Sequence, residues 1–201
     1  MENILTSTSF ISTLFYVAVA LVSIVMYHKS NADYNSKTKK IHSIASFVYI
    51  YKYIQLSTFA VCMVSIWVDH KYLFELYVGN EVLIYTGIAT SGLAITLFAI
   101  SRFSLGKNYS PCYDSYMPRN LKTTGIYSLV RHPIYSSNIL LMIGIFVSTG
   151  SLIIAANTII LFTYYILSAF IEERAIIKKF PKYKSYKSRT GMFIPSFSKM
   201  I

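Results

Sequence analysis

The sequence predicts an all-α protein, a polytopic membrane bundle of about five transmembrane helices. The last two helices are expected to form a tight hairpin, followed by a cytosolic C-terminal segment. Of the 201 residues, 54% are hydrophobic and only 13% are charged, about half the charged share of an average globular protein. Several windows contain the roughly 20 mostly apolar residues that a helix needs to cross a bilayer. Composition and hydropathy together therefore predict an integral membrane protein.

Three apolar segments occupy the first half of the chain. The first, about residues 10–27, has no basic residue before it, which favours a retained helix over a cleaved secretory signal. The second lies within residues 41–68, and its early part, residues 41–52, is expected at the membrane interface because tyrosines favour the headgroup level. The third covers about residues 82–101.

Two further apolar segments follow, at about residues 134–149 and 152–171. The turn-forming residues 148–151, with the sequence Ser-Thr-Gly-Ser, separate them and predict a tight helical hairpin. The second helix of this hairpin is expected to continue to Phe180. It should end there because Pro181 follows, and the residue before a proline disfavours helical geometry.

The charges of the loops set the expected orientation. Residues 28–40 carry four lysines, whereas residues 69–81 carry three acids and one lysine. The stretch after residue 101 and the tail from Arg174 onward are basic again. Because basic loops stay in the cytosol, we expect an outside or lumenal N-terminus and a cytosolic C-terminus. The net charge of +11 is explained by anionic lipid headgroups, so no nucleic-acid partner is expected.

Two polar clusters flank the predicted hairpin. Arg131, His132 and Pro133 stand where the fourth apolar segment begins. Glu172 and Glu173, the only acids after residue 114, stand where the fifth segment ends. A tight hairpin returns the chain to the side from which it came, so the clusters are expected to face each other at one membrane surface. Free N–H groups in the first helical turn, beside two basic side chains, predict a pocket able to hold a carboxylate or phosphate.

The chain is expected to form a single domain over residues 1–201, since neither a repeat nor a low-complexity linker divides it. Residues 1–101 are interpreted as a helical scaffold, and we expect the substrate to reach the site through this half. Residues 102–201 are interpreted as the half that carries the site, on the cytosolic side. Cys62 and Cys112 lack metal-ligand spacing, so no metal site is expected.

The same polar residues also allow purely structural explanations. Arg131 and Glu173 can form a salt bridge that only fastens two helices together. His132 can be a buried polar residue with satisfied hydrogen bonds, and Lys178–Lys187 can be a face that binds headgroups. The tyrosines nearby can be interfacial anchors, namely Tyr127, Tyr135, Tyr183 and Tyr186.

An ordered set of motifs extends through the second half of the chain. It runs Gly125-x-Tyr127-x-x-Val130-Arg131-His132-Pro133-x-Tyr135, then Glu172-Glu173, then Phe180-Pro181-x-Tyr183-x-x-Tyr186 and Phe193-Ile194-Pro195. This order resembles the isoprenylcysteine carboxyl methyltransferase family and its wider group of membrane methyltransferases, which includes phospholipid methyltransferases. The resemblance covers about residues 102–197, half of the chain.

The resemblance implies S-adenosylmethionine as methyl donor, bound by the last two helices and the C-terminal segment. The acceptor it implies is a lipid-borne or hydrophobic molecule, and the leading candidate is a carboxylate such as that of a prenylated cysteine. The implied cofactor-binding residues are Tyr127, Val130, Arg131, His132, Pro133, Tyr135, Glu172 and Glu173. The expected catalytic residues are Arg131, Glu173 and Arg174. Arg174 directly follows the acidic pair as a departure from the family pattern, and it is expected to orient the substrate as a cation.

Two other functions stay open at this point. Membrane sterol and steroid reductases resemble the same half of the chain but use NADPH, and they generally have more membrane helices. A non-catalytic scaffold or transport protein could keep the fold without the chemistry. The presence of Arg131, His132 and both glutamates argues against the non-catalytic alternative.

Overall fold

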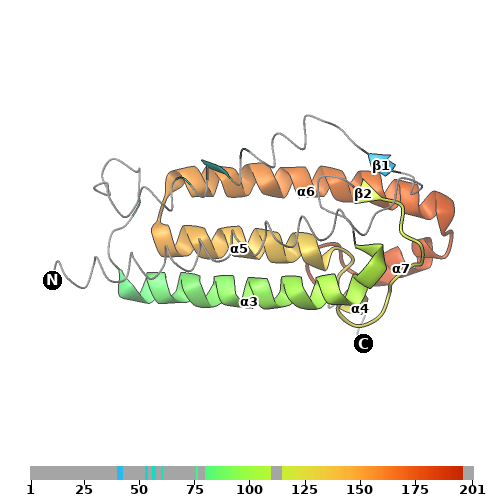
Figure 1. Ribbon diagram of the computed structural model, residues 1–201, viewed down its shortest axis with the longest axis horizontal. Helices are drawn as coiled ribbons and strands as arrows, with labels where there is room; N and C mark the ends of the chain where they lie inside the picture. Colours follow the sequence, from blue (N-terminus) through green and yellow to red (C-terminus); the bar gives the residue numbers. More distant parts are fainter. Residues whose placement is uncertain are drawn as a thin grey trace.

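The computed structural model describes residues 40–42, 53, 56, 57, 60, 76, 80–109 and 115–196. Three long helices, α3, α5 and α6, run side by side, and the shorter helices α4 and α7 gather at one end (Figure 1). Helix α5 lies between α3 and α6 and contacts both. The elements in chain order are β1 (Lys40–His42), α3 (Glu81–Leu105), η2 (Gly106–Asn108), β2 (Ser115–Tyr116), α4 (Ile126–Leu129), α5 (Pro133–Thr149), α6 (Leu152–Lys179) and α7 (Tyr183–Arg189).

The helices predicted at residues 82–101, 134–149 and 152–171 are confirmed as α3, α5 and α6. Helix α6 continues to Lys179 and stops before Pro181, as expected. Both α3 and α6 are long and apolar enough to cross a membrane, whereas α5 has 17 residues. The first predicted segment and most of the second lie outside the described residues, so the five-span count and the orientation stay predictions.

A small two-stranded sheet is an addition that the sequence did not predict. Strands β1 and β2 pair antiparallel, with Lys40 opposite Tyr116. This pairing joins the first residues of the second apolar region, Ile41 and His42, to the stretch between α3 and α4. The described chain is therefore helical, as predicted, with this short ladder near the end of the bundle where α7 lies (Figure 1).

The connection between α5 and α6 is the predicted tight hairpin. Gly150 follows α5 with a φ of 65°, a left-handed conformation that glycine adopts without steric cost. Its N–H donates a hydrogen bond to the Phe146 carbonyl at 2.7 Å, which satisfies one of the free carbonyls at the helix end. Ser151 is the N-cap of α6. The start of α5 and the end of α6 consequently lie at the same end of the bundle.

Helices α3 and α5 approach each other through glycine and serine. A Cβ atom on Gly87 would lie 2.5 Å from the Gly144 carbonyl oxygen, and one on Gly144 would lie 2.3 Å from the Ser91 hydroxyl. Ser91 and Ser148 are both buried at this contact. Small residues allow such close backbone approach between helices in a membrane, where dispersion contacts drive association. These glycine and serine contacts therefore fix the position of α3 against the hairpin.

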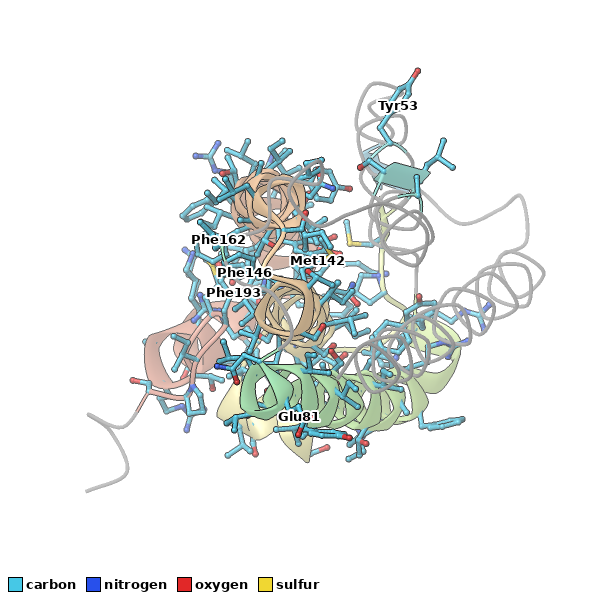
Figure 2. All side chains as sticks on the ribbon, turned by 90° about the vertical axis from the view of Figure 1, so that its left-hand side faces the viewer. Tyr53, Glu81, Met142, Phe146, Phe162 and Phe193 are labelled. Carbon is cyan, nitrogen blue, oxygen red and sulfur yellow. The ribbon has the colours of Figure 1, made fainter. Side chains whose placement is uncertain are left out.

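The core lies mainly between α5 and α6. Phe146 and Phe193 pack against it, and the rings of Phe162 and Phe193 lie 6.2 Å apart; all three are labelled in Figure 2. The outer faces of α3 and α6 are apolar but exposed, as faces turned to lipid would be. The buried core residues are Tyr109, Ile134, Tyr135, Met142, Ile145, Ile154, Leu161, Tyr164, Tyr165 and Ala169.

Candidate functional site

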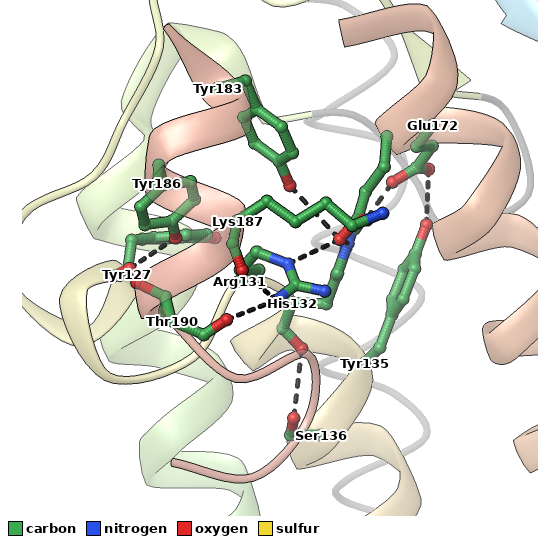
Figure 3. A network of polar contacts seen from close by, with 11 residues as sticks. Tyr127, Arg131, His132, Tyr135, Ser136, Glu172, Tyr183, Tyr186, Lys187 and Thr190 are labelled. Atoms are coloured by element: carbon green, nitrogen blue, oxygen red, sulfur yellow. Dashed lines mark hydrogen bonds and ion pairs between the residues drawn. The ribbon is translucent and has the colours of Figure 1, made fainter. Parts of the chain in front are cut away.

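The two polar clusters predicted to face each other do meet, at the end of the bundle where α5 begins and α6 ends. The Arg131 Nε donates to the Glu173 carboxylate at 2.6 Å, across 42 positions of sequence. Figure 3 shows the surrounding network, in which α7 supplies a third set of side chains. The predicted juxtaposition is therefore confirmed, and the functional roles of its members stay predictions.

The chain before α5 is shaped for this site by local backbone geometry. Gly125, the N-cap of α4, has a φ of 65°, which few residues other than glycine adopt readily. Val130 then returns to extended geometry and leads the chain into α5. Pro133 occupies the first turn of α5, where its missing N–H leaves no hydrogen bond unmade. Arg131 and His132 are thereby placed directly before α5, at the open end of the α5–α6 hairpin.

Glu173 is the centre of the network. Its side chain is only 1% exposed, yet two cations and a histidine surround it. The Lys187 Nζ lies 2.7 Å from Oε2, and the His132 Nε2 lies 3.2 Å from Oε1. The Tyr183 hydroxyl also donates to Oε1 at 3.4 Å. A carboxylate this deeply buried is stable as an ion only because these partners compensate its lost hydration.

Arg131 connects Glu173 to the end of α7. Besides its ion pair, Arg131 donates from its guanidinium to the carbonyl of Lys187 at 3.2 Å and to the carbonyl of Thr190. These carbonyls belong to the last turn of α7 and its C-cap, which have no partners within the helix. The salt bridge expected as a structural alternative is therefore real, and it also fastens α7 to the hairpin.

The segment after α7 pairs with the residues before α5 through a short parallel bridge between Val130 and Gly191. Arg131 donates its backbone N–H to the Gly191 carbonyl at 2.8 Å, and His132 donates to the Met192 carbonyl at 3.0 Å. The Ser136 hydroxyl donates to the Phe193 carbonyl at 2.7 Å. A Cβ atom on Gly191 would lie 1.9 Å from the Ile194 carbonyl oxygen, so only glycine fits this turn. Residues far apart in sequence are thus held together by backbone hydrogen bonds.

Glu172 has different surroundings from Glu173, although the two are adjacent. The Tyr135 hydroxyl donates to Glu172 Oε1 at 2.5 Å, and the His132 Nδ1 lies 3.7 Å from Oε2. The His132 and Tyr135 rings stack at 5.2 Å, and Tyr135 stacks in turn on Tyr165 at 4.5 Å. Glu172 lines the pocket, while the carboxylate of Glu173 is directed at the cations that hold α7.

Two tyrosines of α7 are buried in the site instead of lying at a headgroup surface. Tyr183 is 3% exposed and Tyr186 is 7% exposed. The Tyr186 hydroxyl donates to the Tyr127 carbonyl at 2.5 Å. Burial raises the pKa of Tyr186 to about 12, and burial together with the charge of Glu173 raises the pKa of Tyr183 further. Both phenols therefore stay protonated and act as hydrogen-bond donors at physiological pH.

A pocket opens beside this network and contains most of the predicted cofactor residues. Of the expected cofactor-binding and catalytic residues, three do not line the pocket: Val130 is buried, Glu173 faces α7, and Arg174 is exposed on α6. The other expected residues do line it, namely Tyr127, Arg131, His132, Pro133, Tyr135 and Glu172. The lining residues not expected from the sequence are Leu105, Asn108, Pro118, Asn120, Leu121, Lys122, Ile134, Ile176, Tyr183 and Tyr186.

One wall of the pocket is the loop of residues 118–122, which we call the strap. Asn108 lies in η2, just past the Gly106 C-cap of α3, and its side-chain oxygen accepts from the N–H groups of Arg119 at 3.0 Å and Asn120 at 3.4 Å. The Lys179 ammonium, at the end of α6, donates to the Pro118 carbonyl at 2.8 Å. The strap is thus held by η2 and α6, and the sequence spacing alone does not predict that these two helices meet there.

Sequence spacing offered a usable signal for only some of these contacts. Tyr183 and Tyr186 are three positions apart, so on a helix they share one face, and that face could have been predicted to be buried. Lys187 stands within a basic run and nothing in the sequence distinguishes it from its neighbours. Among the residues the structure describes, no group of three or more His, Cys, Asp or Glu side chains could hold a metal ion.

Comparison with known proteins agrees with this arrangement. Residues 82–183, about half of the chain, match the phospholipid methyltransferase family, which belongs to the group of isoprenylcysteine methyltransferase-like membrane enzymes. The match spans α3, α5, α6 and the start of α7, and so includes most of the pocket walls.

Two curated proteins are similar to the same part of the chain. The cobalt-zinc-cadmium resistance protein CzcN of Cupriavidus metallidurans is 33% identical over 118 residues, which are 57% of this chain and 55% of that protein. The nickel-cobalt-cadmium resistance protein NccN of Alcaligenes xylosoxydans xylosoxydans is 28% identical over 128 residues, or 63% of this chain and 60% of that protein. The chain therefore spans little more than half the length of these relatives. Its motifs, its apolar helices and the extent of the family match show that the chain belongs to the phospholipid methyltransferase family of membrane methyltransferases.

Proposed function

We propose that this chain is an S-adenosylmethionine-dependent methyltransferase that acts at the membrane on a hydrophobic, lipid-borne acceptor. The observation that carries the proposal is the pocket at the end of the hairpin. It is lined by Glu172 and by the stacked rings of His132 and Tyr135. Family membership favours methyl transfer over the reductase that the sequence left open.

The residues of the pocket fit a donor with a positive charge and a nucleoside. Glu172 is the one carboxylate that lines the described pocket, and it suits a ribose hydroxyl or a neighbouring positive charge. The face of Tyr135 can stabilise a cation through its ring quadrupole. Leu105, Leu121 and Ile176 provide apolar surface for a flat base. S-adenosylmethionine, when bound, supplies an electrophilic methyl group carried by a sulfonium.

The role of the protein in the reaction is to hold and align the methyl donor and the acceptor and to exclude water. Methyl transfer is an in-line displacement, so orientation accounts for much of the rate enhancement. Tyr183 and Tyr186 of α7 form one wall of the pocket, and the segment after α7 is held by hydrogen bonds from Arg131, His132 and Ser136. A wall on this side limits the access of bulk water to the reacting atoms.

The protein groups around the pocket favour an acceptor that is already ionised. Both ring nitrogens of His132 face a glutamate, at 3.2 Å and 3.7 Å, and Glu172 accepts from Tyr135. Neither side chain is therefore presented as an unoccupied general base. A carboxylate, such as that of a prenylated cysteine, needs no deprotonation before attack, and it remains the acceptor we propose.

The proposal is tested by calorimetric titration of the purified full-length protein with S-adenosylhomocysteine and, separately, with NADPH. We expect saturable binding of S-adenosylhomocysteine and no binding of NADPH. Binding of NADPH alone contradicts the proposal. Transfer of a labelled methyl group is then compared between a farnesylated cysteine analogue and vesicles of phosphatidylethanolamine. Methylation of the lipid amine alone contradicts the carboxylate acceptor but leaves the donor assignment intact.

A further inference from the structure

The charged side chains that line the pocket differ in how far other groups of the protein compensate their charge. Arg131, Lys122 and Glu172 are the permanently charged side chains among the described lining residues. Each has a different degree of engagement with the rest of the chain. Which of them is left for a ligand can be decided by following the contacts of each in turn.

Arg131 is not left for a ligand, because the protein uses it. Its Nε pairs with Glu173 at 2.6 Å, and its terminal nitrogen donates to two carbonyls at the end of α7. Glu173 in turn has Lys187 at 2.7 Å on its other oxygen. This buried group of charges is compensated within the protein and contributes little attraction for an anion in the pocket.

Lys122 differs from Arg131 in every one of these respects. It lines the pocket from the strap and is half-buried. Within the described part of the chain, its ammonium forms no hydrogen bond or ion pair with the protein. The part of the strap just before it is nevertheless held in place, because Lys179 donates to the Pro118 carbonyl and Asn108 accepts from the N–H groups of Arg119 and Asn120. A positioned cation without a protein partner is suited to a ligand anion.

Another wall of the pocket carries the opposite charge. Glu172 lines the pocket from α6, where its carboxylate accepts from the Tyr135 hydroxyl and lies 3.7 Å from the His132 Nδ1. The pocket therefore presents a negative group from α6 and a positive group from the strap. A ligand that carries both a cationic and an anionic group is complementary to that pair.

We infer that Lys122 binds the carboxylate of the amino-acid part of the methyl donor, while Glu172 faces the cationic side of the same ligand. This inference rests on the proposed function and extends it, because it assigns the strap a role in donor binding. The strap then acts as a specificity-determining element that separates donors with an amino-acid carboxylate from simple nucleosides.

The test uses two ligands that differ in the amino-acid part, whose carboxylate Lys122 is inferred to bind. S-adenosylhomocysteine carries this part, and 5′-deoxy-5′-methylthioadenosine is a nucleoside thioether that lacks both its carboxylate and its ammonium. Dissociation constants are measured by calorimetry for the full-length wild type, Lys122→Met and Lys122→Arg. The matched control is Lys184→Met, since Lys184 is exposed on α7 and does not line the pocket.

We expect Lys122→Met to weaken S-adenosylhomocysteine binding by about tenfold, the effect of one charge-assisted hydrogen bond at a half-exposed site. Binding of the methylthio nucleoside should change by less than about twofold, and Lys122→Arg should restore most of the loss. The difference between wild type and Lys122→Met should shrink as salt is added, because exposed charges are screened. Lys184→Met should bind both ligands as the wild type does.

Two results overturn the inference, and each differs from a failure of the proposed function. Unchanged binding of S-adenosylhomocysteine by Lys122→Met shows that the donor carboxylate does not contact this lysine; a raised KM for the acceptor then places the ligand anion on the acceptor. Equal weakening of both ligands assigns Lys122 to the stability of the strap. If the wild type binds neither nucleoside, the proposed function itself fails.

Discussion

The exchange of Glu173 for glutamine is the perturbation whose outcome the structure defines most closely. The substitution keeps the size and shape of the side chain but removes its charge. Arg131, whose side chain is 7% exposed, is then left buried without its ionic partner. Lys187 is 39% exposed and can turn to water, so it contributes less to the loss.

The magnitude follows from the burial of the pair. Removal of one member of a buried ion pair costs about 3–5 kcal/mol, because the other charge stays desolvated. For a chain of this size, each kcal/mol lowers the unfolding temperature by about 2–4 °C. We therefore expect Glu173→Gln to lower it by about 6–20 °C, with α7 detached from the hairpin before the helices separate.

The assay is thermal unfolding in detergent, followed by limited proteolysis to locate the loosened segment. Glu172→Gln is the matched control, since Glu172 lies on the same helix and contacts the Tyr135 hydroxyl and the His132 ring. Its unfolding temperature should fall by less than about 4 °C, the effect of weakening one hydrogen bond. Equal stability of Glu173→Gln and wild type, with equal protection of the C-terminal segment, would refute the assignment of Glu173 as the fastening group.

Three further predictions concern positions with defined geometry. Gly144→Ala should lower the free energy of unfolding by about 1–3 kcal/mol, because the new Cβ would lie 2.3 Å from the Ser91 hydroxyl. Gly92→Ala should leave stability unchanged or raise it, because a Cβ there has nothing within 4 Å. Equal unfolding temperatures for the two variants would contradict the packing of α3 on α5. Gly191→Ala should expose the C-terminal segment to proteolysis and weaken binding of S-adenosylhomocysteine, because its Cβ lies 1.9 Å from a carbonyl oxygen; a protease-resistant variant would show that the turn adapts. Tyr135→Phe keeps the stacked ring but removes the donor to Glu172, so stability should fall by about 1 kcal/mol; chemical denaturation measures this loss, and a loss above about 3 kcal/mol would contradict it.

Much of the second half of the fold could be predicted because hydrophobicity and turn chemistry act locally. The helices α3, α5 and α6, the hairpin at Gly150 and the end of α6 before Pro181 all follow from short-range rules. The meeting of Arg131 with Glu173 also followed, since a tight hairpin brings its two outer ends together. These features need no knowledge of distant contacts.

The division of work between the two glutamates could not be predicted from the sequence. Adjacent helical residues point about 100° apart, so only one of them can face a given neighbour. Which one faces the pocket depends on where α7 docks, and α7 docks through Lys187 and Thr190, some 56 and 59 positions from Arg131. The strap was missed for the same reason, because Asn108 and Lys179 hold it from separate helices.

The central claim is that the pocket between α5, α6 and the strap binds the methyl donor through Glu172. Its most direct test is calorimetric titration of the wild type and of folded Glu172→Gln with S-adenosylmethionine. We predict saturable binding by the wild type and at least about tenfold weaker binding by the variant, the loss of one charge-assisted contact. Equal affinities, or no binding by a folded wild-type protein, would contradict the account.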